Sequence, residues 1–163
     1  MLSSMRIASP VGPLTLVADA SQLLAVLWPN EGHQRMRFEK TCEDLHHPVL
    51  VEAQRQLTEY FRGKRTTFEL PIHFLGTAFQ QRVWRQLLSI PYGQTRSYGQ
   101  VARAIGNPSS FRAVGAANGK NPLSIVVPCH RVIGASGELT GFGGGLDVKA
   151  ALLDLEGASS NFP

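Results

Sequence analysis

The stretch Ile125-Val126-Val127-Pro128-Cys129-His130-Arg131-Val132 holds the most chemically informative residues of this chain. Three β-branched residues in a row predict a short buried strand over residues 125–127. Pro128 has no backbone N–H, so it should end the hydrogen-bond ladder of that strand. Cys129 therefore follows the end of a strand, where a side chain can face a cleft.

An imidazole and a guanidinium, from His130 and Arg131, directly follow Cys129. Positive charge near a thiol favours the thiolate, which is the nucleophilic form of cysteine. These residues alone leave two interpretations open. Cys129 is either a reactive thiol facing a cleft or a small core residue beside surface charges.

The composition is that of a globular protein with one large domain or two small ones. The chain has 163 residues, of which 43% are hydrophobic and 17% charged. No apolar run is long enough to span a bilayer, and Met1 to Pro13 lacks the pattern of a secretory signal. Two cysteines, Cys42 and Cys129, do not make a disulfide framework. We therefore expect a cytoplasmic protein.

The excess positive charge lies in the second half of the chain. Residues 1–78 hold eight Lys or Arg and eight Asp or Glu, whereas residues 79–163 hold eight and four. No acidic residue lies between Glu69 and Glu138. Such a one-sided stretch predicts a polyanionic partner, with nucleic acid as the leading candidate. A basic surface that only aids solubility is the alternative.

Short strands are predicted for the first part of the chain. Apolar runs at residues 6–8, 14–18 and 23–28 are separated by turn residues, which predicts an antiparallel meander. Residues 30–47 are polar and show no clear period.

A helix is predicted over residues 50–61, because its apolar residues have helical spacing and Gly63 follows as a stop. A further strand is predicted over residues 66–70. After Pro71 the pattern changes to a series of short helices with clear start and stop signals, so we divide the chain into domains of residues 1–73 and 74–163.

Two capping boxes, Thr77-x-x-Gln80 and Ser97-x-x-Gln100, each predict the start of a helix. A turn at Gly106-Asn107-Pro108 separates the second helix from a third, predicted over residues 110–118. Two short helices joined by a tight turn match a helix-turn-helix, in which the third helix is the recognition helix.

Glycines cluster at 134–137 and 141–145, where they permit positive φ and close backbone approach. They predict a wing or lid over a site. A nucleotide-phosphate loop is not supported, since neither of the glycine motifs for phosphate binding is present. Asp147 is predicted to cap a last helix that ends at Glu156-Gly157. Its predicted apolar face consists of Val148, Ala151, Leu152 and Leu155.

Pro128-Cys129-His130-Arg131-Val132 lies downstream of Tyr98, Arg112 and Asn121, and upstream of Gly144-Gly145 and Glu156. In this combination the chain resembles the O6-alkylguanine-DNA alkyltransferase (methylated-DNA–protein-cysteine methyltransferase) family. The resemblance implies an α/β N-terminal domain, with a small antiparallel sheet and a helix in a ribonuclease-H-like arrangement. It also implies a mainly helical, winged-helix-like C-terminal domain with a helix-turn-helix.

The resemblance further implies direct reversal of DNA damage. The family removes an alkyl group from O6 of guanine and keeps it on its own cysteine, so each molecule acts once. Cys129 matches the acceptor, His130 the base that forms the thiolate through a water, Glu156 the carboxylate that orients this His, and Asn121 the residue that organises the turn. A free thiol with a pKa of about 8.5 is mostly protonated at neutral pH, so it needs such a base.

The alkylated base must leave the duplex stack to reach the sulfur. Arg112 matches the family's finger, which fills the gap in the stack, and Tyr98 matches a residue that crowds the 3′ phosphate and hydrogen-bonds the guanine. The family's recognition helix enters the minor groove, where the small residues Ala113 and Gly115 would allow a close fit. Arg131 is a further expected DNA contact.

The expected substrate pocket consists of Tyr98, Val132, Phe142 and Gly143. Phe142 departs from the family, which usually has Tyr there, so the hydrogen bonding of the pocket wall stays open. The expected partner is double-stranded DNA containing O6-alkylguanine, with O4-alkylthymine open as a second substrate. We expect a monomer without cofactor or membrane contact, and leave cooperativity on DNA open.

Some relatives have a zinc site in the N-terminal part. Cys42, His33, His46 and His47 do not match that pattern, and one Cys with scattered His is a weak indication of metal. We therefore expect no metal.

Each site residue also has an ordinary structural interpretation. Glu156 and Arg112 could be surface charges, Tyr98 a core aromatic and Asn121 a turn former. Two other function classes also remain. One is a cysteine hydrolase or transferase with turnover, which the basic stretch disfavours unless its substrate is anionic. The other binds O6-alkylguanine without chemistry, and the presence of Cys129 disfavours it.

Overall fold

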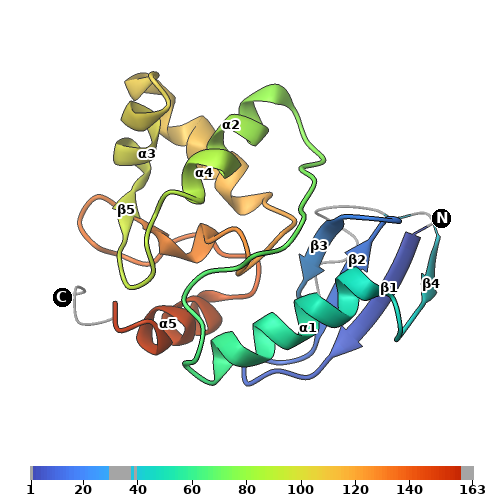
Figure 1. The fold of residues 1–163 in the computed structure, drawn as a ribbon. Helices are drawn as coiled ribbons and strands as arrows, with labels where there is room; N and C mark the ends of the chain where they lie inside the picture. Colours follow the sequence, from blue (N-terminus) through green and yellow to red (C-terminus); the bar gives the residue numbers. More distant parts are fainter. Residues whose placement is uncertain (1, 30–37, 39, 159–163) are drawn as a thin grey trace. The chain divides into compact units, whose positions relative to one another are not determined.

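A computed structural model describes residues 2–29, 38 and 40–158 of the chain. The chain folds as two compact units, Met1–Leu75 and Gly76–Pro163. Each has its own set of secondary-structure elements, coloured in chain order in Figure 1.

The first unit is built on a four-stranded sheet with strand order β3-β2-β1-β4. Strands β1 (Leu2–Ile7), β2 (Leu14–Ala18) and β3 (Leu23–Leu27) form the predicted antiparallel meander. All five residues of β3 are buried, which agrees with its continuous apolar run.

Two expectations about strands in this unit are wrong. Strand β4 (Thr41–Glu43) lies within residues 30–47, where no strand was predicted, and it pairs in parallel with β1, so the sheet is mixed. Residues 66–70 form no strand. Here the buried Gln56 side chain takes the place of a strand partner, because its amide accepts from Glu69 N (2.9 Å) and donates to Glu69 O (3.1 Å).

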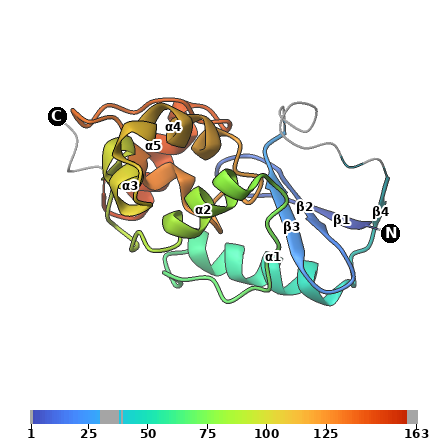
Figure 2. The same cartoon turned by 90° about the horizontal axis from the view of Figure 1, so that it is seen from above.

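Helix α1 (Pro48–Phe61) lies across one face of the sheet (Figures 1 and 2). It buries Leu50, Ala53, Leu57 and Tyr60, which follow the helical period of the sequence. Gly63, with φ of 72°, follows its C-terminus as predicted. Among the described residues, no helix is both long and apolar enough to cross a membrane.

The second unit begins with helix α2 (Ala78–Leu87), followed by α3 (Tyr98–Ala104) and α4 (Phe111–Gly119). Both predicted capping boxes are present, at Thr77 and at Ser97. The buried indole of Trp84 on α2 donates to Ala117 O on α4 at 2.8 Å. These three helices pack together, and α3 and α4 form the predicted helix-turn-helix.

The turn between α3 and α4 depends on Gly106, which has φ of 82°. Gly106 N–H donates to Arg103 O and Asn107 N–H to Ala102 O, the Schellman pattern that closes a helix. This local signal sets the point at which α3 ends and α4 can start.

The unit ends with helix α5 (Leu146–Leu155), which packs against the turn Cys129–Arg131. Asp147 lies in the first turn of α5 and Gly145 is the N-cap, so the predicted cap at Asp147 is wrong. The buried face is also shifted by one residue from the prediction. It consists of Lys149, Leu152, Leu153 and Glu156.

Candidate active site

The chain reaches Cys129 through a buried turn. Ile125 has φ of 72°, a left-handed conformation that β-branched residues rarely adopt. Val126 N–H donates to Ser124 O (2.8 Å), and Val127 N–H to Leu123 O (2.9 Å). The strand predicted over residues 125–127 is therefore wrong, although these residues are buried as expected.

Asn121 gives the physical reason for this turn. Its side chain is fully buried, its Oδ1 accepts from Leu123 N–H at 3.0 Å, and its Nδ2 donates to Val127 O at 2.9 Å. One side-chain amide thus provides hydrogen-bond partners for backbone groups at both ends of the turn, in place of a neighbouring strand. The structure places this predicted site residue directly behind the cysteine segment.

Cys129 starts a short 3-10 turn, Cys129–Arg131, and is buried with 1% exposure. Its N–H donates to Val127 O at 2.8 Å, and its carbonyl accepts from Asn118 Nδ2 at 3.2 Å. From the sequence, Asn118 was only the last residue of the predicted third helix. An Asn on the buried side of a helix was the signal that it has a partner in the core.

His130 and Glu156 are 26 positions apart in sequence but meet in the core of this unit. Because an ionised carboxylate only accepts, His130 Nε2–H donates to Glu156 Oε2, at 2.7 Å. Both side chains have 0% exposure. With the proton on Nε2, Nδ1 is the basic nitrogen of His130, and it has no hydrogen-bond partner among the described residues.

Arg131 holds the same carboxylate from its other side. Its Nε donates to Glu156 Oε1 at 2.8 Å and its Nη2 to Oε2 at 3.0 Å, a bidentate pair. Its Nη1 donates to Ile90 O at 2.7 Å, and its guanidinium carbon lies 5.8 Å from the centroid of the Tyr92 ring. The structure thus places Arg131, predicted as a DNA contact, in the interior with 6% exposure.

This buried cluster shifts the pKa of His130 and of Glu156. Burial lowers the pKa of His130, and the hydrogen bond to Glu156 only partly opposes this. His130 is therefore mostly neutral at pH 7, which suits a base. Burial alone would raise the pKa of Glu156, but the hydrogen bonds from His130 and Arg131 outweigh it and hold that pKa well below its usual range.

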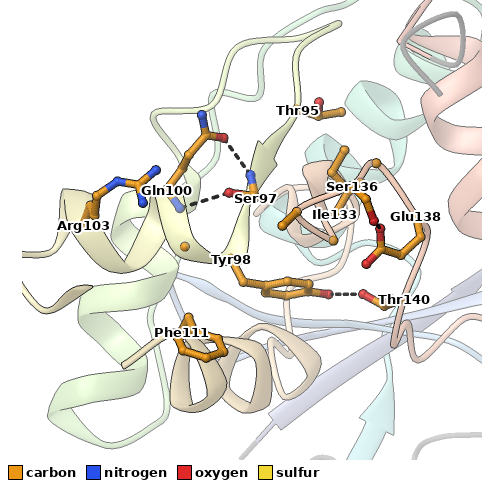
Figure 3. Close-up of a pocket in the computed structure, with 14 residues that line it drawn as sticks. Thr95, Ser97, Tyr98, Gln100, Arg103, Phe111, Ile133, Ser136, Glu138 and Thr140 are labelled. Carbon is orange, nitrogen blue, oxygen red and sulfur yellow. Dashed lines mark hydrogen bonds between the residues drawn. The ribbon is translucent and has the colours of Figure 1, made fainter. Parts of the chain in front are cut away.

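A cavity of about 920 Å³ lies beside the helix-turn-helix (Figure 3). It is bordered by the start of α3, by Phe111 and by residues 133–138 and Thr140. Tyr98 points into this region, and its hydroxyl lies 2.9 Å from Thr140 Oγ1.

Of the predicted pocket residues, Tyr98 borders this cavity, whereas Val132, Phe142 and Gly143 do not. Val132 is buried, Phe142 half-buried and Gly143 exposed. Burial raises the pKa of Tyr98, and negative charge on Cys129 and Glu138 raises it further.

Three of the predicted DNA-binding residues, Arg112, Ala113 and Gly115, lie on helix α4. Arg112 and Ala113 are exposed in its first turn. A Cβ added to Gly115 would lie 3.7 Å from the Tyr98 ring, an ordinary van der Waals contact, so Gly115 faces that ring. The guanidinium carbon of Arg112 lies 5.8 Å from the ring centroid of Phe111.

Lys149 is a buried charge that sequence reasoning missed. It has 0% exposure, and its Nζ donates to Val132 O (2.6 Å) and Thr140 O (2.9 Å). It thereby ties the segment after Cys129 to the glycine-rich loop. Burial lowers its pKa to about 8, an effect that negative charge on Cys129 opposes. Its position seven residues before Glu156, on the same helical face, was the available signal.

The N-terminal Cys and His residues that were considered for a zinc site have different structural positions. Cys42 is exposed on β4, and His47 caps α1, with its Nε2 2.8 Å from Asp19 O. His33 lies outside the described residues. Within the part of the chain that the structure describes, no group of three His, Cys, Asp or Glu could hold a metal ion.

Two family models match almost the whole chain. Residues 78–158 match the 6-O-methylguanine DNA methyltransferase, DNA binding domain, and residues 5–74 match its ribonuclease-like domain. The chain belongs to the 6-O-methylguanine DNA methyltransferase family.

Particular relatives agree with this assignment. The chain is 49% identical over 156 residues to the methylated-DNA–protein-cysteine methyltransferase of Mycobacterium bovis, covering 96% of this chain and 93% of the relative. It is 46% identical over 150 residues to the protein of that name from Methanosarcina acetivorans, covering 92% and 95%.

A solved structure is similar over the whole fold. The crystal structure of Mycobacterium tuberculosis OGT in complex with DNA matches with a TM-score of 0.85 and 48% identity, over 99% of this chain and 94% of that one. The mixed sheet with its helix, followed by a helical DNA-binding domain, is therefore the fold of that protein as well.

Proposed function

We propose that this protein repairs O6-alkylguanine in double-stranded DNA by transferring the alkyl group to Cys129. The observation that carries the proposal is the buried set of Cys129, His130 and Glu156, next to a helix-turn-helix in the DNA-binding domain of the family. The names of the relatives, methylated-DNA–protein-cysteine methyltransferases, support the same reaction.

In the proposed reaction the Cys129 thiolate attacks the alkyl carbon bonded to O6 of guanine. The S–C bond forms as the C–O6 bond breaks, and the electron pair of that bond goes to O6. The guanine anion then takes up a proton and becomes an ordinary guanine. Atoms and charges balance without a cofactor or metal, and the thioether has no route back to the thiol.

His130 acts in this proposal as the base that takes the thiol proton through a water. Its Nδ1 is the nitrogen suited to this task, because Nε2–H is bound to Glu156. The low pKa of His130 supports the role, since a neutral imidazole is needed at pH 7. We propose that Arg131 acts by holding Glu156, in place of the DNA contact predicted from the sequence.

On the DNA side, we propose that α4 enters the minor groove and that the target nucleotide is flipped out of the duplex. Arg112, exposed in the first turn of α4, would fill the gap in the stack, and Ala113 and Gly115 would allow close approach. Tyr98 would contact the flipped guanine, which its position at the cavity supports. The protein would act as a monomer in a reducing cytoplasm.

The test is to incubate the protein with a duplex that carries one O6-methylguanine, digest it, and locate the methyl group by mass spectrometry. We expect one methyl group on the Cys129 peptide and a repair plateau at one lesion per protein molecule. The exposed Cys42 is an internal control and should stay unmodified. Cys129→Ser should bind the lesion without transfer, because a neutral hydroxyl is a poor nucleophile.

Two outcomes would support the other function classes. Repair that continues beyond the plateau, with no methyl on the protein, indicates a hydrolase-like enzyme. Tight binding of the lesion DNA by the unmodified protein, with the lesion intact, indicates a binding protein without chemistry.

A further inference from the structure

Phe111 is a large apolar side chain at the first position of helix α4, and 47% of it is exposed. A single exposed apolar residue needs no explanation by itself. The surroundings of Phe111 are what set it apart. Its ring borders the 920 Å³ cavity together with Tyr98 and Arg103 (Figure 3), and the guanidinium of Arg112 lies 5.8 Å from the ring centroid.

The charge around Phe111 indicates the chemistry of its partner. No acidic residue lies between Glu69 and Glu138 in the sequence, and Arg103 and Arg112 are exposed on α3 and α4. Glu138 is the carboxylate among the residues that border the cavity, and it is hydrogen-bonded by the Ser136 hydroxyl. A partner that suits both an exposed ring and these arginines is anionic and carries flat aromatic faces, as DNA does.

We propose that Phe111 is a second stacking residue for DNA. Its ring packs on the base next to the flipped nucleotide, while Arg112 occupies the gap that this nucleotide leaves. Proteins that enter the minor groove insert apolar side chains between base steps in this way. The inference rests on the proposed function and adds to it a contact that lowers the free energy needed to open the duplex.

Stacking of one base on an aromatic ring is tolerant of sequence, because every base has a π-face. Such a contact suits a protein that must act at a lesion in any context. Loss of one base–aromatic stack weakens binding by about 5- to 150-fold. We expect this loss in Phe111→Ala, and expect Phe111→Tyr and Phe111→Trp to recover most of it.

The first measurement is the Kd for a duplex with one O6-methylguanine, taken in the Cys129→Ser background so that no transfer occurs. Phe111→Ala should raise the Kd by about 5- to 150-fold without changing its salt dependence, because the ring is uncharged. Arg103→Ala should instead reduce the salt slope by about one. Leu88→Ala is the matched control, since Leu88 is also 47% exposed but does not border the cavity.

The second measurement compares single-turnover transfer from the duplex with transfer from the free base O6-benzylguanine. Phe111→Ala should slow the first and leave the second within about twofold, since the free base needs no opened stack. Equal slowing on both substrates would overturn the proposal, because it would assign the ring to the base pocket. An unchanged rate and Kd on the duplex would overturn it as well.

A third comparison separates a direct contact from support of Arg112. In the Arg112→Ala background, Phe111→Ala should still weaken DNA binding. If the effect of Phe111→Ala disappears there, the ring only orients the guanidinium and the proposal fails. Failure of the proposed function is distinguishable, because the parent protein would then leave Cys129 without a methyl group from the duplex and without a benzyl group from the free base.

Discussion

Replacing Glu156 by Gln should strongly destabilise the C-terminal unit. The carboxylate accepts from His130 Nε2 at 2.7 Å and from Arg131 Nε and Nη2 at 2.8 and 3.0 Å. Its side chain has 0% exposure. Gln has almost the same shape, but it has one acceptor oxygen and an amide NH₂ that cannot accept. One of the two oxygen positions that accept hydrogen bonds in the parent protein would therefore hold an NH₂ group, which cannot accept.

Two independent considerations give similar magnitudes. With the Gln oxygen at the Oε2 position, the bond from Arg131 Nε is lost, at about 1.5–3 kcal/mol, and the other two each weaken by about 1 kcal/mol without the negative charge, or about 3–5 kcal/mol in total. Removing one partner of a buried ion pair costs about 3–5 kcal/mol, because the other charge stays buried. We therefore expect the free energy of unfolding to fall by about 3–5 kcal/mol, and the Tm by about 6–20 °C.

The assay is urea denaturation followed by tryptophan fluorescence. The chain has two tryptophans, so a Trp28→Phe background leaves Trp84, which is buried on α2 in the same unit as Glu156. The matched control is Asp154→Asn, which removes one negative charge from an exposed position on α5. A surface substitution of this kind usually changes stability by less than about 0.5 kcal/mol.

The pH dependence gives a further check. Because folding lowers the pKa of Glu156 from its usual 4.5, its stabilisation is fully present above pH 4.5 and is lost as the pH falls below that value. The difference between the parent protein and Glu156→Gln should therefore shrink at acid pH. A difference below about 1 kcal/mol at pH 7 would refute the reasoning, since a buried pair cannot lose one partner at so low a cost.

Three other predictions concern the same unit. Folding lowers the pKa of His130 from 6.5, so its contribution to stability is complete above pH 6.5 and is lost as the pH falls below that value. Urea denaturation between about pH 5 and 8 should show this decrease in the free energy of unfolding in the parent but not in His130→Gln. Asn121→Ala should lower the free energy of unfolding by about 2–5 kcal/mol, because the backbone groups of Leu123 and Val127 lose their buried partners, whereas an unchanged urea midpoint would show that the turn forms without them. Phe142→Ala should slow single-turnover transfer strongly, while Phe142→Tyr should stay within about tenfold of the parent, because it only adds a hydroxyl; a Phe142→Ala variant as fast as the parent would exclude this ring from the pocket wall.

The sequence by itself determined most of the features that depend on near neighbours along the chain, although not the N-cap of α5. The capping boxes at Thr77 and Ser97, and the glycine stops at Gly63 and Gly106, all have the expected geometry. Their signals are local, because a cap or a positive φ involves residues three or four positions apart. The Pro-Cys-His-Arg motif, together with the residues spaced around it, likewise indicated the family.

Tertiary structure alone decided which residues meet across long separations. The parallel pairing of β4 with β1, the bidentate pair of Arg131 with Glu156, and the burial of Lys149 have no local pattern that requires them. The three β-branched residues after Ser124 predict a strand. In the structure they form a turn with Ile125 at φ of 72°, which the hydrogen bonds of the buried Asn121 amide stabilise. Strand propensity is a property of the isolated segment. A buried polar group, in contrast, needs a hydrogen-bond partner that the fold provides, and here the hydrogen bonds of the Asn121 amide decide the backbone conformation.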